Sequence, residues 1–132
     1  KLIGKPELDI YYREYYETVR KGLEEFDLHR IDRLFHGAPA AIVIGGNRKA
    51  TLPMEDAMLA TQNILLAAHS MGLGTCLIGM AVEAIKRDSR IKKAIGVPDQ
   101  ERIYSIISVG YMDEKYVRAA GRKRPVMRFL EQ

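Results

Sequence analysis

The stretch from Gly72 to Gly79 is the first candidate for chemistry, because it holds three glycines within eight residues. Glycines let the backbone approach a flat ligand closely, and free peptide N–H groups can bond to acceptor atoms such as those of a flavin ring. The alternative is a helix C-cap followed by a tight helix-to-strand turn. Spacing alone favours this alternative, since short glycine motifs often occur by chance.

The basic run Arg122-Lys123-Arg124 is the second candidate. Guanidinium groups bind phosphate through paired hydrogen bonds and keep their charge at every relevant pH. Taken alone, however, a run of charges is more often a solvated tail. Nucleic-acid binding would need stacking aromatics within a basic face, and Tyr116 and Phe129 are too few and too scattered, so no nucleic-acid partner is expected.

The remaining reactive side chains form no catalytic or metal-binding pattern. Cys76 is the only cysteine and has no histidine or acid close in sequence, so we expect a small buried hydrophobe rather than a reactive thiol. His29, His36 and His69 lack metal-ligand spacing. Neither a nucleophile elbow, a P-loop nor a carboxylate pair is visible.

The composition indicates a single ordinary domain. The chain has 132 residues, of which 47% are hydrophobic, with a formal net charge of +4. No stretch is long and apolar enough to span a bilayer, so no membrane partner is expected. One cysteine and no signal-peptide pattern together predict a reducing, cytoplasmic setting.

Periodicity and breaker residues predict the elements that would position these candidates. A long helix is predicted to begin at Pro53 and stop at Gly72, and it is apolar almost all round, which is typical of a helix covered by a partner subunit on one face. The other predicted elements are a helix over Pro6–Phe26, a buried strand over Ala40–Ile44, a helical turn over Val82–Lys86, a helix capped by Asp88 or Ser89, a strand over Arg102–Gly110 and an exposed strand over Val126–Leu130.

The order of these pieces resembles the nitroreductase family, over roughly residues 33 to 130. No single motif is specific for the family, but the whole set, in this order and at the family's spacing, is specific. The version most similar to this chain is the short anaerobe and archaeal type, sometimes fused to a ferredoxin domain. The matching stretches are Leu34 to Ile44, Asp56-Ala57 with Ala60, Gln62-Asn63, Leu66-Ala67-Ala68, Met71 to Gly79, Ile95-Gly96-Val97-Pro98, Val109-Gly110-Tyr111 and Arg122-Lys123-Arg124-Pro125.

The resemblance implies an α+β fold with a mainly antiparallel sheet flanked by helices. It also implies an intertwined homodimer with two FMN sites at the interface, in which the C-terminal strand crosses to the partner's sheet. The activity would be an FMN-dependent oxidoreductase, taking electrons from NAD(P)H or a ferredoxin-like donor and passing them to a nitroaromatic, quinone or similar small molecule. The alternative is a flavin-free dimeric binding or regulatory relative.

Carried over residue by residue, the family's flavin-ring contacts fall on Leu77, Ile78, Gly79 and Met80, acting mainly through backbone groups. No side chain would be a catalytic acid or nucleophile, since the flavin carries the chemistry and the protein orients it.

The family's basic pair that contacts the FMN phosphate falls on Arg122 and Lys123, with a register that could slide to Arg124. The chain departs from the family's pattern in one large respect. Family members usually begin with an Arg-rich segment that binds FMN, and nothing in this sequence matches it. Residues 1–132 are therefore expected to form one nitroreductase-like domain that lacks this segment, either as a fragment or through loss.

Overall fold

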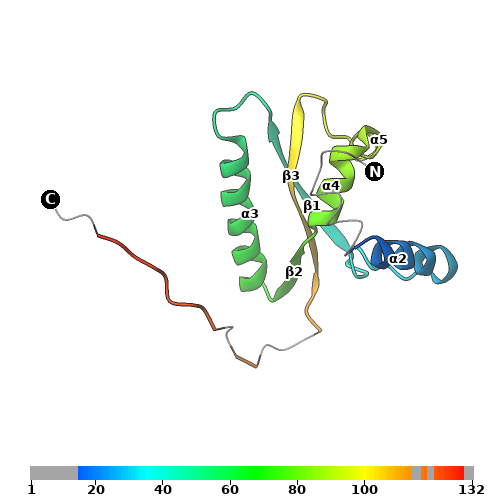
Figure 1. Cartoon of the computed structure of the whole chain (residues 1–132), viewed down its shortest axis with the longest axis horizontal. Helices are drawn as coiled ribbons and strands as arrows, with labels where there is room; N and C mark the ends of the chain where they lie inside the picture. Colours follow the sequence, from blue (N-terminus) through cyan, green and yellow to red (C-terminus); the bar gives the residue numbers. More distant parts are fainter. Residues whose placement is uncertain (1–14, 114–116, 119–120, 130–132) are drawn as a thin grey trace.

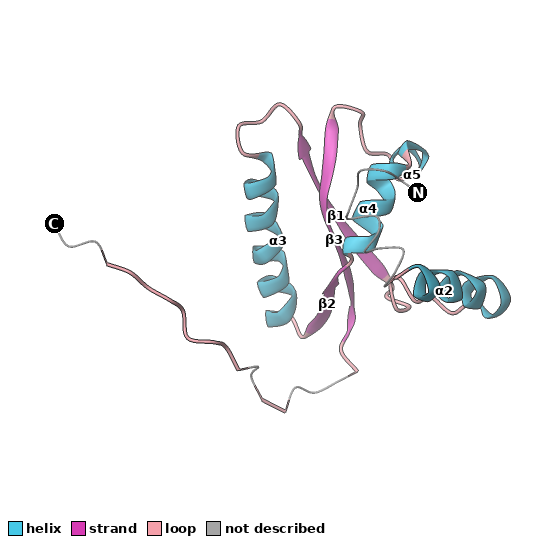
Figure 2. Ribbon diagram, viewed as in Figure 1, coloured by secondary structure: helices cyan, strands magenta, loops and turns pink. Residues whose placement is uncertain are grey.

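The structure, a computed structural model, describes residues 15–113, 117–118 and 121–129. The described part is an α+β arrangement in which helices cover both faces of a three-stranded sheet (Figure 1). In chain order the elements are α2 (Tyr16–His29), β1 (Ala40–Asn47), α3 (Pro53–Ser70), β2 (Leu73–Leu77), α4 (Gly79–Arg87), α5 (Ser89–Ala94) and β3 (Glu101–Tyr111). Helix α2 has no buried residue and extends away from the sheet (Figure 2).

The sheet is fully antiparallel, with strand order β1-β3-β2. The last strand in sequence is therefore the central one, and β1 and β2 are edges. The register places Ile42 opposite Ile107 on the β1 side and Leu77 opposite Ile107 on the β2 side. β2 pairs only with the second half of β3, which leaves the first half without a strand on that edge.

A β-bulge interrupts the pairing of β1 with β3. Ile44 lies opposite Ser105 and Gly45 opposite Ile103, so Tyr104 has no partner on β1. The extra residue reverses the alternation of side chains along β3, and Tyr104 consequently packs with the apolar cluster beneath α3.

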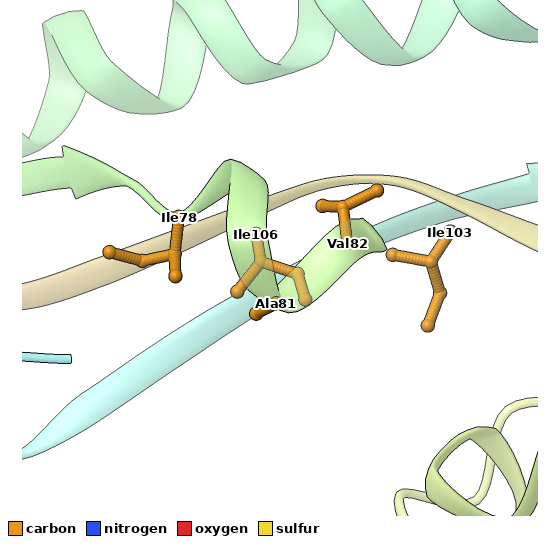
Figure 3. Packing of buried hydrophobic residues seen from close by; sticks show 5 residues of the cluster. All are labelled: Ile78, Ala81, Val82, Ile103 and Ile106. Atoms are coloured by element: carbon orange, nitrogen blue, oxygen red, sulfur yellow. The ribbon is translucent and has the colours of Figure 1, made fainter. Parts of the chain in front are cut away.

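Two apolar cores lie on opposite faces of the sheet. Ile106 and Ile107 are consecutive residues of β3, so their side chains point to opposite sides. The α3 side buries Ile44, Ala57 and Ile107, with Ile64, Leu65, Tyr104 and Val109 packed around them. The α4 side buries Ile78, Ala81, Val82, Ile103 and Ile106 (Figure 3).

Helix α3 confirms the predicted long helix to within one residue at its end. Pro53 occupies the first turn and Glu55 and Asp56 place negative charge there, which suits the positive end of the helix dipole. Gly72 has φ +75°, the left-handed conformation that ends helices, so the alternative interpretation of this glycine as a helix stop is confirmed.

Helices α4 and α5 are separated by a single residue, Asp88. Its carboxylate accepts a hydrogen bond from the backbone N–H of Arg90 at 2.9 Å, which confirms it as the predicted cap of α5. The side chain of Arg90 also donates to this carboxylate and lowers the pKa of Asp88 to about 2.

The predictions for three segments need correction. The strand over Ala40–Ile44 was expected to be buried, but it is an edge strand that buries Ile44 alone, with Ile42 38% and Val43 39% exposed, because only β3 pairs with it. The Gly72–Gly79 stretch was expected to be a loop with a short extended centre, and that extended part is the five-residue strand β2. Residues 126–129 form no strand with the described part of this chain, so a strand that pairs with a second copy stays a prediction, and Leu130 lies outside the described residues.

The first helix was only partly placed. Its predicted C-terminal half is present but starts at Tyr16 and continues to His29, and the first residues of the predicted span, 6–14, lie outside the described part. Among the helices that the structure describes, none combines the length and apolar character needed to cross a membrane.

Candidate functional site

A hollow of about 380 Å³ opens where β2 ends and α4 begins. Its base is the first half of β3, where no strand continues the sheet, and α3 and α4 form its walls. One hydrogen bond fixes the backbone beside the hollow: the N–H of Ile78 donates to the carbonyl of Ile106 at 2.8 Å. The lining residues are Met58, Leu77, Ile78, Gly79, Val82, Glu83, Lys86, Tyr104, Ser105 and Ile106.

Three of the four predicted ring contacts line this hollow, namely Leu77, Ile78 and Gly79. Met80 does not line it, and its side chain is 47% exposed. Because Met80 follows Gly79 within the first turn of α4, its backbone N–H remains close to the same helix end. The assignment of Met80 as a contact through its backbone stays a prediction.

Gly79 leaves one side of the hollow open. Apart from its chain neighbours and the backbone of its own helix, a Cβ built on Gly79 would meet no atom of the described residues within 4 Å, so the space beside it is free for a ligand. Gly79 is also the first residue of α4, and the described residues give this helix no side-chain cap. The N–H groups of its first turn therefore lack intrahelical partners and point toward acceptors outside the helix.

The remaining walls combine apolar surface with one charged pair. Met58, Leu77 and Val82 supply apolar contact for a flat ring. At the rim, Lys86 donates to the Glu83 carboxylate at 2.5 Å. This bond, together with a second from Arg87, lowers the pKa of Glu83, so the Glu83 carboxylate stays ionised near neutrality. The hollow thus suits a planar heterocycle that accepts backbone hydrogen bonds.

The structure does not bring the basic run to the hollow of the same chain. Arg122, Lys123 and Arg124 are exposed in an extended segment that leads away from the sheet (Figure 1). The candidate site of one chain therefore contains a place for a ring but not the proposed phosphate contacts, whose exact register also stays a prediction.

Sequence reasoning missed Met58, Tyr104 and the Glu83–Lys86 pair. Met58 was assigned only to an apolar helix face, and Tyr104 to an isoleucine-rich strand. The spacing of Glu83 and Lys86 is a helical ion-pair signal that could have been used. The bulge that turns Tyr104 toward the hollow leaves no comparable signal.

Cys76 was predicted to be buried, and this was wrong. Its side chain is exposed, because β2 is an edge strand and α4 covers only the first half of β3. The neighbouring Ser108 hydroxyl donates weakly to the carbonyl of Cys76 at 3.4 Å. Among the described residues, no group of three or more His, Cys, Asp or Glu side chains is placed to hold a metal ion.

An antiparallel sheet of this order, with a helix on each face, places the chain in the α+β class. The sequence model of the Nitroreductase family matches residues 10–111. The chain belongs to the nitroreductase family, and the expectation drawn from the motifs is confirmed.

Two archaeal relatives match most of the chain. A protein of Archaeoglobus fulgidus, provisionally named NADH dehydrogenase/NAD(P)H nitroreductase, is 30% identical over 105 residues, which is 75% of this chain and 58% of the relative. A protein of Methanothermobacter thermautotrophicus with the same provisional name is 32% identical over 100 residues, 72% of this chain and 52% of the relative. The chain thus spans little more than half the length of these relatives.

Solved structures confirm the fold. An FMN-bound nitroreductase of Bacteroides fragilis is 18% identical with a TM-score of 0.67, covering 93% of this chain and 65% of that one. An FMN-dependent nitroreductase of Clostridium difficile is 38% identical with a TM-score of 0.53, covering 61% of this chain and 50% of that one. The predicted fold class is therefore correct.

Proposed function

We propose that this chain acts as an FMN-dependent oxidoreductase in which the hollow beside Gly79 holds the flavin ring. The observation that carries the proposal is the combination of open space at Gly79 with the uncapped first turn of α4. The family membership and the FMN in the names of solved relatives support the choice of cofactor.

FMN, when bound, supplies the redox chemistry by taking two electrons from a reduced donor and passing them to an acceptor. The donor would be NAD(P)H or a ferredoxin-like protein, and the acceptor a nitroaromatic, a quinone or a similar small molecule. For a nitroaromatic and a nicotinamide donor, the balanced reaction is ArNO₂ + NAD(P)H + H⁺ → ArNO + NAD(P)⁺ + H₂O.

The chain's own residues would bind and orient the ring. Backbone N–H groups at Gly79 and Met80 would donate to ring acceptors, which fixes the ring without a catalytic side chain. Met58 and Leu77 would exclude water from one side, and low local polarity strengthens the hydrogen bonds made there.

The phosphate of FMN would be bound by Arg122 and Lys123, with Arg124 as the alternative register. Because the segment that carries these residues leads away from the sheet of its own chain (Figure 1), the proposal requires that they serve the hollow of a second copy. Such a homodimer agrees with the exposed apolar side chains of the tail, which include Val126, Met127 and Phe129.

The substitution Gly79→Val tests the ring site. A branched side chain there would fill the open space and block the ring. The fold should survive, because among the described residues only chain neighbours and the backbone of α4 itself come within 4 Å of the new Cβ. We expect FMN titration by fluorescence quenching to show binding lost or weakened by about tenfold or more, as for one misplaced group in a packed site.

The matched control is Ala84→Val, which adds the same kind of side chain to an exposed position of α4 that lines no hollow. It should bind FMN as the unsubstituted protein does. Equal flavin affinity in the two variants would contradict the ring site. A colourless protein that ignores added FMN would instead indicate a flavin-free relative of the family.

The double substitution Arg122→Ala, Lys123→Ala tests the phosphate contacts. Charge-assisted hydrogen bonds of this kind predict a loss of about 2–4 kcal/mol in FMN binding. Replacing Arg118 and Arg128 by alanine removes the same charge outside the run, and this control should lose much less. An equal loss in both doubles would mean that only general charge attracts the cofactor.

A further inference from the structure

A second groove, of about 600 Å³, adjoins the hollow between the N-terminus of α3, α4 and the beginning of β3. The two concavities share Met58, Lys86 and Tyr104 in their linings. A molecule that lies in the hollow can therefore extend into the groove. The remaining lining residues are Arg48, Pro53, Met54, Ile85, Lys92, Glu101, Arg102 and Ile103.

One part of the groove is apolar. Met54 and Met58 lie one turn apart on α3 and are 60% and 38% exposed, so their side chains are accessible to a ligand. Ile85 of α4 and Ile103 of β3 line the same groove. A surface of this kind packs against an aromatic or aliphatic body, for which a bare inorganic anion has no use.

The other part of the groove is positively charged. Lys86 is paired with Glu83, but within the described part of the chain neither Arg48 nor Arg102 forms an ion pair. The Arg102 guanidinium lies over the Tyr104 ring, 5.8 Å from its centroid. Because Tyr104 also lines the hollow, this cation is held where the two concavities meet.

The sheet brings the two arginines to one end of the groove. The register places Gly46 opposite Arg102, and the backbone N–H of Arg48 donates to the carbonyl of Gln100 at 3.2 Å. Both arginines therefore lie where β1 ends and β3 begins. A guanidinium presents a fork of N–H donors that matches a carboxylate.

Lys92 fixes this end of β3 from below. Its residue is only 7% exposed, and the ammonium donates to the carbonyls of Asp99 at 3.1 Å and Glu101 at 2.7 Å. Both acceptors are neutral, so the described residues leave the charge of Lys92 uncompensated. An anion in the groove would offset the cost of burying this charge.

The groove contains one opposing charge, the carboxylate of Glu101. Three cations outside ion pairs (Arg48, Lys92 and Arg102) against this carboxylate leave the groove positive. An apolar wall beside a positive end fits a molecule with an apolar body and an acidic group.

We propose that Arg48 and Arg102 select the electron acceptor by its charge, so that the preferred acceptor is an electron-poor aromatic molecule carrying a carboxylate. This inference rests on the proposed function and deepens it, because it names the class of acceptor and the residues that choose it. The carboxylate binds the arginines and takes no part in electron transfer. The body packs on Met54 and Met58, and the reducible group reaches the hollow beside Gly79.

The test is calorimetric titration of the oxidised, flavin-loaded protein with 4-nitrobenzoate and with 4-nitrobenzamide, which has nearly the same shape but no charge. Without a reduced donor, neither compound is consumed. We expect the acid to bind at least about tenfold more tightly than the amide. In the double variant Arg48→Ala, Arg102→Ala the two affinities should become nearly equal. Both arginines are exposed, so the variant should fold.

Two further variants sharpen the titration. Glu101→Gln should increase the preference for the acid, because it removes the opposing charge from the groove. Lys93→Ala is the matched control, since it removes a cation of α5 that does not line the groove. It should leave the preference unchanged.

Steady-state kinetics give a second readout. Removing an interaction that is equally strong in the ground state and the transition state raises KM and leaves kcat unchanged. The double variant should therefore raise KM for 4-nitrobenzoate by about tenfold with little change in kcat. Its KM for 4-nitrobenzamide should not move.

Equal affinity for acid and amide in the unsubstituted protein would overturn the inference, as would a preference that survives in the double variant. A double variant that loses bound FMN would also overturn it, since the arginines would then belong to the flavin site. Titration of flavin-free protein separates the two proposals. A preference for the acid in a protein that never binds FMN rejects the proposed function, whereas FMN binding without the preference rejects the charge selection alone.

Discussion

Gly74 and Gly79 belong to one short stretch but differ in what surrounds them. A Cβ on Gly74 would lie 2.9 Å from the Cγ of Met112, so this glycine is needed for packing within the chain. A Cβ on Gly79 would touch nothing, so packing alone does not require a glycine there. Only the second glycine carries an argument for a ligand.

Asp88 gives a prediction for pH dependence. Its pKa is about 2 in the folded chain, against an ordinary value of 3.8, because Arg90 and a backbone N–H stabilise the ionised form. A carboxyl whose pKa is lowered on folding contributes stability above its unfolded pKa, and that contribution is lost as the pH falls through the folded pKa.

The variant Asp88→Asn should therefore be less stable than the unsubstituted protein at pH 7, with the difference fading as the pH falls from about 4 to about 2. Urea unfolding followed by circular dichroism over this range measures the difference. Because the Asp88 side chain is only partly buried, the effect should be modest and weaker at high salt. A difference that stays constant across the range would show that the charge of Asp88 plays no part.

At the scale of elements, β3 contributes residues to both apolar cores and to the lining of the hollow. Ile107 is fully buried, whereas its register partner on β1, Ile42, is 38% exposed on the same face of the sheet. The central strand thus holds the apolar contacts that an edge strand cannot make alone.

We expect Ile107→Ala to lower the free energy of unfolding by about 2–5 kcal/mol, because it removes fully packed atoms and leaves a cavity. Ile42→Ala, the matched substitution one strand away, should cost clearly less. Chemical denaturation of both variants measures the two losses. Similar losses would mean that Ile42 is buried by something beyond this single chain.

The elements could largely be predicted from the sequence, but their pairing could not. Pro53, Asp88 and the run of isoleucines in β3 carry local signals of a helix start, a cap and a strand. The central place of β3 and the bulge at Tyr104 depend on contacts between distant segments, which periodicity does not report. The same limit explains why Ala40–Ile44 was wrongly expected to be buried.

At the scale of the whole molecule, the long helix leaves apolar surface uncovered. Leu59 and Leu66 lie two turns apart on α3 and are 68% and 59% exposed. Met71 at the end of the same helix is exposed as well. Large exposed apolar surface of this kind marks an interaction site, and the proposed homodimer would cover it.

If α3 forms the interface of the proposed homodimer, the double substitution Leu59→Glu, Leu66→Glu should convert that dimer to a monomer, since it places charge in the interface. Light scattering coupled to size exclusion measures the change. Lys93→Glu alters the net charge by the same amount on α5, far from α3 (Figure 1), and should leave the dimer intact. A doubly substituted protein that stays dimeric would place the interface elsewhere.

The sequence could predict the part of the candidate site that is formed by residues adjacent in the chain. Leu77, Ile78 and Gly79 are adjacent in the chain, so they reach one hollow together. The basic run is more than forty residues farther along the chain. In the proposed homodimer its place relative to the ring is set by a second copy, which local sequence does not report.

A crystal structure of the protein loaded with FMN tests the central claim most directly. The account predicts electron density for the flavin ring between Met58 of α3 and the first turn of α4, with backbone N–H groups near Gly79 donating to the ring. A ring bound elsewhere, with the hollow filled by side chains of the protein itself, would contradict it.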